Sequence, residues 1–186
     1  NYYFLKSIVS SKNYNISFKL LVEELKHYQK EHKKIFTYKE LSMVFYILVF
    51  IYTERLNELC KEEYLRLSDK EDVAAIIKNH EILSATDFFP TNFDIHSNSH
   101  YIFEVNNQLY RIGKNSNELF KELNEYLKEK NISLKELINE EYQRKIDNNI
   151  LISNIFSDLK DFFDYSMEDL FEKVSKTEKL LLTDPA

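Results

Sequence analysis

Apolar positions recur with a helical period along most of the chain. The first such run spans about residues 16–34, and four further stretches begin with a Ser or Thr followed three residues later by an acidic residue, which is typical of a helix N-terminus. These starts lie at Thr37–Glu40, Ser68–Glu71, Ser133–Glu136 and Ser166–Asp169. The pattern predicts a mainly α fold, a bundle of several helices.

The most apolar stretch is LSMVFYILVFIY, residues 41–52. It is shorter than the roughly 20 residues that a membrane-spanning helix needs. Beyond Thr53 the pattern becomes one-sided, with Leu56, Leu59 and Cys60 on the apolar side. A helix that is apolar all round and then amphipathic is typical of a core helix that leaves its bundle. We therefore expect a central apolar helix over about residues 38–66.

One segment alternates with a period of two instead. In YIFEVNNQLYRI, residues 101–112, the Asn106-Asn107 pair is suited to a two-residue turn, since Asn tolerates a left-handed backbone. The turn would place six side chains on one face: Tyr101, Phe103, Val105, Gln108, Tyr110 and Ile112. The sequence therefore predicts one β-hairpin over about residues 101–112, packed on the helices.

The length of 186 residues fits a single helical domain, residues 1–186. After Gly113 the apolar spacing predicts three or four helices. A polar stretch near residues 145–149 suggests a soft junction before a C-terminal helical hairpin.

Composition narrows the function classes. A single glycine excludes glycine-rich phosphate loops and dinucleotide fingerprints, and a single cysteine excludes a disulfide framework and multi-cysteine zinc sites. The one cysteine fits a reducing, cytoplasmic location. Abundant Phe, Tyr, Ile, Asn and Lys indicate an AT-rich genome.

Charge argues against general nucleic-acid binding, because the formal net charge is −6. A local basic run, KHYQKEHKK, carries Lys26, Lys30, Lys33 and Lys34. It is either a solvated helix face or a binding site for a nucleic acid or another anionic partner.

Four metal-ligand types lie within eleven residues: Asp94, His96, His100 and Glu104. The spacing from Asp94 to Glu104-Val-Asn106 resembles a degenerate PD-(D/E)xK nuclease motif, with Asn106 in the place of the lysine. The resemblance implies that Asp94 and Glu104 bind Mg²⁺ or Mn²⁺, and His96 or His100 would then act as general base. The alternative interpretation is a polar loop without a site.

A second acidic cluster is formed by Asp158, Asp161 and Asp164. We expect these side chains on a solvated helix side opposite Phe156, Leu159, Phe162 and Phe163, with an acidic surface for a basic partner as the alternative.

Two functions of different class follow. The favoured one is a non-enzymatic interaction or regulatory protein without a cofactor, which binds another macromolecule and most readily a protein. The 27 Phe and Tyr side chains exceed what the predicted core faces need, and exposed aromatics are enriched at interfaces. The second is the metal-dependent, nuclease-like hydrolase of residues 94–104. A homo-oligomer through an aromatic face is a further option.

Overall fold

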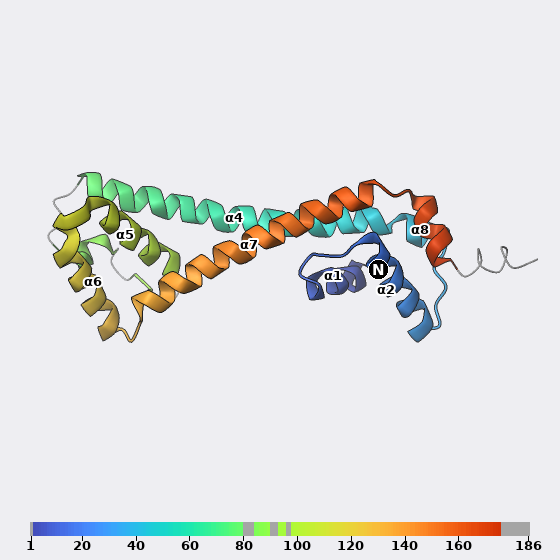
Figure 1. The fold of residues 1–186 in the computed structure, drawn as a ribbon, viewed down its shortest axis with the longest axis horizontal. Coiled ribbons are helices and arrows are strands. Elements are labelled where there is room, and N and C mark those ends of the chain that lie inside the picture. The colour runs from blue at the N-terminus through green and yellow to red at the C-terminus, as the bar shows by residue number, and fades with distance from the viewer. Residues whose placement is uncertain (1, 80–83, 90–92, 96–97, 176–186) are drawn as a thin grey trace, which may run out of the picture. The chain divides into compact units, whose positions relative to one another are not determined.

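The computed structural model describes residues 2–79, 84–89, 93–95 and 98–175 (Figure 1). The protein is mainly helical, which confirms the predicted class. The helices are α1 (Tyr2–Ser11), α2 (Phe18–Glu31), α3 (Tyr38–Ser42), α4 (Val44–Asn79), α5 (Ser99–Ile112), α6 (Asn117–Glu129), α7 (Leu134–Phe163) and α8 (Met167–Val174), with short 3-10 turns η1 (Ala85–Phe88) and η2 (Gly113–Ser116).

The contacts divide the chain into two compact units. The terminal unit contains the residues up to Glu58 and those from Asn148 onward, and the middle unit contains Leu59–Asp147. Helices α4 and α7 contribute residues to both. Residues 145–149, the expected soft junction, lie inside the continuous helix α7. The single-domain organisation stays a prediction.

Three of the four predicted helix starts are confirmed. Thr37 and Ser166 form reciprocal capping boxes with Glu40 and Asp169, and the Ser133 hydroxyl accepts a hydrogen bond from the amide of Glu136. The start predicted at Ser68 is wrong, because this residue lies inside α4. The central helix also differs from its predicted bounds. The helix is interrupted at Met43, which separates α3 from α4, and α4 then extends to Asn79.

The predicted β-hairpin is wrong. Residues 101–112 belong to α5, and no strand occurs among the described residues. Tyr101, Ile102, Val105 and Leu109 are buried at helical spacing, and Asn106, expected in a turn, is also buried. Over so short a segment the apolar residues satisfy both periods, and tertiary packing selects the helix.

The core of the terminal unit is built from α1, α2, α4 and α7. Its most deeply buried side chains include Leu5, Val9, Ile16, Leu21, Leu25, Leu48, Ile51, Tyr52 and Ile155. Helix α8 packs against α2 and α3. The buried amide of Gln29 joins them, donating to the carbonyl of Val174 at 3.0 Å and accepting from the amide of Phe36 at 3.3 Å.

Helix α4 does not bury its apolar stretch all round, contrary to the expectation. Val44, Leu48 and Ile51 are buried, whereas Tyr46 and Phe50 are exposed. No helix within the described ranges is both long enough and apolar enough to cross a membrane.

A buried carboxylate ties the loop between α1 and α2 to α7. Asp158 accepts hydrogen bonds from the Tyr52 hydroxyl and from the amide of Ile16, both at 2.7 Å. Asp161, one turn further, accepts from the amide of Phe18 at 2.8 Å. The prediction of a solvated aspartate side is therefore wrong for Asp158, which is 4% exposed.

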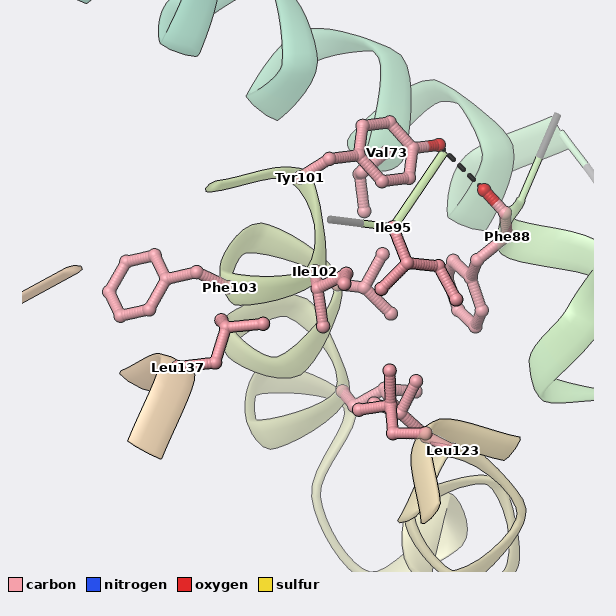
Figure 2. Packing of buried hydrophobic residues seen from close by; sticks show 11 residues of the cluster. Val73, Phe88, Ile95, Tyr101, Ile102, Phe103, Leu123 and Leu137 are labelled. Atoms are coloured by element: carbon pink, nitrogen blue, oxygen red, sulfur yellow. Dashed lines mark hydrogen bonds between the residues drawn. The ribbon is translucent and has the colours of Figure 1, made fainter. Parts of the chain in front are cut away.

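The middle unit has its own core, shown in Figure 2. Ile102 of α5 packs with Val73 of α4, Leu123 of α6 and Ile95. The Tyr101 hydroxyl donates to the carbonyl of Phe88 at 2.6 Å and so holds η1 on the core. Burial raises the pKa of Tyr101 to about 12.

Candidate functional site

The residues proposed for a metal site are only partly brought together. Asp94 is exposed and precedes α5, where its carbonyl accepts a hydrogen bond from the side chain of Asn98. His100 and Glu104 lie one turn apart on α5 and line the same cleft, where His100 contacts Asp69. His96 lies outside the described residues. Among the residues that are described, no three His, Cys, Asp or Glu side chains are placed to hold a metal ion.

The backbone at the nuclease-like motif differs from the prediction. The predicted hairpin would place Glu104 on a strand, whereas Glu104-Val-Asn106 lies within α5. His100 and Glu104 lie on one side of α5 because they are four residues apart on a helix. The metal-dependent hydrolase stays an untested prediction.

The basic run is divided by the end of α2. Lys26 and Lys30 lie on this helix, whereas Lys33 and Lys34 follow it. The ammonium group of Lys34 forms an ion pair with Glu40 at 2.7 Å, and this pair lowers the pKa of Glu40 to about 2. Lys34 is thus engaged within the chain, and a nucleic-acid role of the run stays a prediction.

The terminal unit carries a different candidate, an apolar groove of about 220 Å³. Its floor is Phe162, which is 5% exposed and stacks on Phe45 and Tyr52 with ring centroids 5.8 and 6.3 Å apart. Tyr165 stacks on the buried ring of Phe18 at 3.8 Å. The rings contact one another directly and form an aromatic base for the groove.

The walls of the groove are exposed to solvent. Tyr46 and Val49 of α4 are 68% and 38% exposed, and Phe163 at the end of α7 is 79% exposed. Met167 at the start of α8 completes the lining. The capping box of Ser166 fixes this last wall, because it sets where α8 begins. We call these residues, with Phe45, Leu159, Phe162 and Tyr165, the aromatic groove.

The apolar surface continues from the groove along α4. Met43, directly before α4, and Phe50 are 47% and 60% exposed. Together with Tyr46 they follow one another at intervals of three and four residues, which is the spacing of one helix face. The exposed stripe therefore runs from Met43 along about the first two turns of α4.

Acidic side chains accompany the groove. Residues 161–169, which supply four of its lining residues, contain four acidic residues and no basic one. Asp161 and Asp169 bond to backbone amides, whereas Asp164 and Glu168 are exposed. The ammonium group of Lys173 lies over the Tyr165 ring at 5.5 Å and adds one positive charge nearby.

Tyr46 and Phe163 were expected on core faces and instead line the groove. One feature of the sequence indicates such a surface: residues 41–52 contain more apolar side chains than one helix face can bury. A comparison with protein-family models, with curated proteins and with solved structures gives no match. The function has therefore to be inferred from the chain's own geometry.

Proposed function

We propose that the protein is a non-enzymatic interaction module whose aromatic groove binds an amphipathic helix of a partner protein. The observation that carries this proposal is the exposure of Tyr46, Val49 and Phe163 around a groove with a buried aromatic floor. Large apolar side chains that cluster at a surface mark interaction sites, whereas scattered ones do not. Tyr and Phe are also enriched among the residues that dominate protein–protein binding energy.

The size of the groove favours inserted side chains over a drug-sized ligand. Its volume of about 220 Å³ lies below the roughly 300–1,000 Å³ of pockets that enclose drug-sized ligands. It suits the insertion of one or two apolar anchors from a larger partner. The exposed stripe along α4 would then contact the remainder of that partner.

The spacing of the stripe favours a helix as the occupant. Side chains three and four residues apart form ridges on α4, and the grooves between these ridges can accept the ridges of a second helix. A partner helix would present apolar residues at positions i, i+3, i+4 and i+7. The exposed carboxylates of Asp164 and Glu168 favour Lys or Arg at the flank of that helix. A cytoplasmic location stays a prediction beside this proposal.

The test is a selection of peptides on the full chain from a library of helical peptides with randomised surface positions. We expect the selected sequences to share apolar residues at i, i+3, i+4 and i+7 with a basic flank. Dissociation constants are then measured for wild type and for Tyr46→Asp. The matched control is Tyr64→Asp, because Tyr64 also lies on α4, is 72% exposed and belongs to the other unit.

A charge placed in the groove should weaken binding at least roughly tenfold, as expected for a central interface residue. The Tyr64→Asp variant should bind as wild type does. Equal binding by all three proteins would overturn the proposal. The alternative occupant of the groove is a second copy of this chain, and sedimentation of wild type without peptide tests for it. A dimer that dissociates in Tyr46→Asp would assign the groove to that second copy.

A further inference from the structure

The middle unit contains a cleft of about 130 Å³ that the proposed function does not use. Helices α4, α5 and α7 line it. Among its lining residues, Lys and Arg side chains outnumber acidic ones. Four cationic side chains, Arg66, Lys70, Arg144 and Lys145, face three glutamates, Glu63, Glu104 and Glu141.

Arg144 is held in a fixed orientation. Its Nε donates to Glu141 at 3.0 Å and its Nη1 donates to Glu63 at 3.1 Å. Glu141 is 6% exposed and also accepts a hydrogen bond from Ser99. The second terminal nitrogen, Nη2, is buried and has no hydrogen-bond partner among the described residues.

Arg66 is placed differently. Its guanidinium lies 3.8 Å from Glu141, 3.9 Å from Glu63 and 4.0 Å from Glu62, which are ion-pair distances and not hydrogen bonds. Its side chain is 19% exposed, and its buried Nε has no hydrogen-bond partner among the described residues. Buried N–H groups of a charged side chain are costly when unpaired, so two of them beside one cleft require an explanation.

We propose that this cleft binds a phosphoryl group through Arg66 and Arg144. A phosphoryl group offers several oxygen acceptors to guanidinium N–H donors, and arginine forms with it the strong, charge-assisted type of hydrogen bond. Lys70 and Lys145 are exposed at the cleft and add two positive charges. These charges attract a phosphate dianion more strongly than a carboxylate with a single charge.

The glutamates have a compatible role. Glu63 and Glu141 orient the Arg144 guanidinium and thereby leave its Nη2 for a ligand. Because their charges are engaged by arginine, they oppose an incoming anion less than free carboxylates would. Leu67 and Phe103, which also line the cleft, provide apolar contact for an organic substituent on the phosphate.

The test is calorimetric titration of the full chain with inorganic phosphate and, separately, with phenyl phosphate, in a chloride buffer. The variants are Arg66→Gln and Arg66→Lys, because the Arg66 side chain forms ion pairs but no hydrogen bond with the residues that the structure describes. The matched control is Lys61→Gln, an exposed cation on the same helix that does not line the cleft.

We expect saturable binding by wild type and by Lys61→Gln. Removal of the Arg66 guanidinium should weaken it roughly tenfold or more, as for the loss of a charged hydrogen bond. Arg66→Lys should also bind more weakly, since lysine keeps the charge but lacks the Nε–H. Tighter binding of phenyl phosphate would assign the site to a phosphate monoester, and equal binding to the phosphoryl group alone.

Two results would overturn the inference. One is the absence of saturable binding to either probe at millimolar concentration, and the other is equal binding by wild type and Arg66→Gln. Circular dichroism of each variant shows whether a loss reflects unfolding. A failure here leaves the aromatic groove untouched, because no residue is shared between the two sites.

Discussion

The buried contact between Tyr52 and Asp158 gives the sharpest stability prediction. Tyr52→Phe removes the hydroxyl that donates to Asp158 at 2.7 Å and changes little else, because the ring stays in place. Both side chains are buried. Loss of a hydrogen bond to a charged group costs about 1.5–3 kcal/mol, and we expect the free energy of unfolding to fall by that amount.

Asp158→Ala should cost more, about 3–5 kcal/mol, because it leaves both the Tyr52 hydroxyl and the Ile16 amide without their acceptor. Asp158→Asn is nearly isosteric and keeps one oxygen acceptor. The assay is urea unfolding followed by circular dichroism, with amide hydrogen exchange at Ile16 as the local probe. Exchange at Ile16 should accelerate in Asp158→Ala and much less in Asp158→Asn.

A double-mutant cycle isolates the contact. Tyr52→Phe and Asp158→Ala should not be additive, with a coupling of at least about 0.5 kcal/mol, as found for residues in contact. Additive effects would refute the reasoning, since they would mean that the two side chains do not interact in solution.

The same pair predicts a dependence on pH. Burial raises the pKa of Asp158 and outweighs the hydrogen bonds from Ile16 and Tyr52, which lower it. A carboxyl whose pKa is raised on folding stabilises the fold most below its unfolded value of about 3.9, and this contribution is lost as pH rises through the folded pKa. The stability of wild type relative to Asp158→Asn should therefore decrease from about pH 4 to pH 7. A relative stability that increases over this interval would contradict the assigned direction.

Three further substitutions test the fold by unfolding measurements. Ser166→Ala should lose about 1 kcal/mol because it removes the N-cap of α8, whereas the control Ser153→Ala, inside α7, should not destabilise. Ser68→Ala should stabilise by a few tenths of a kcal/mol if α4 is continuous at this exposed position, and a loss near 1 kcal/mol would indicate a helix start there instead. Gln29→Leu should cost about 2–5 kcal/mol, since two buried backbone groups lose their partner, and a change below 1 kcal/mol would contradict their burial.

Structural features that depend only on residues close in the sequence could be predicted. The caps at Thr37, Ser133 and Ser166 are such features, because a side chain that bonds to an amide three residues away needs no tertiary partner. The Ser68 pattern shows the limit of this rule. The same residues also continue a helix without strain, and α4 runs through them to Val73, which is buried in the core of the middle unit.

Features that depend on distant partners could not be predicted. Asp158 faces the core because the amide of Ile16, 142 residues away in the chain, requires an acceptor there. The cleft and the aromatic groove likewise draw their residues from helices far apart in the sequence. His100 and Glu104 line one cleft because α5 spaces them by one helical turn, and this could not be predicted from a segment that was expected to form a hairpin.

The most direct test of the proposed function is amide hydrogen exchange of the full chain with and without a selected helical peptide. The account predicts slower exchange in residues 43–50 and 159–167, which form the groove and its stripe, and no change in α5 or α6. Protection confined to the middle unit, or no protection at a saturating peptide concentration, would contradict the assignment of the aromatic groove as the binding surface.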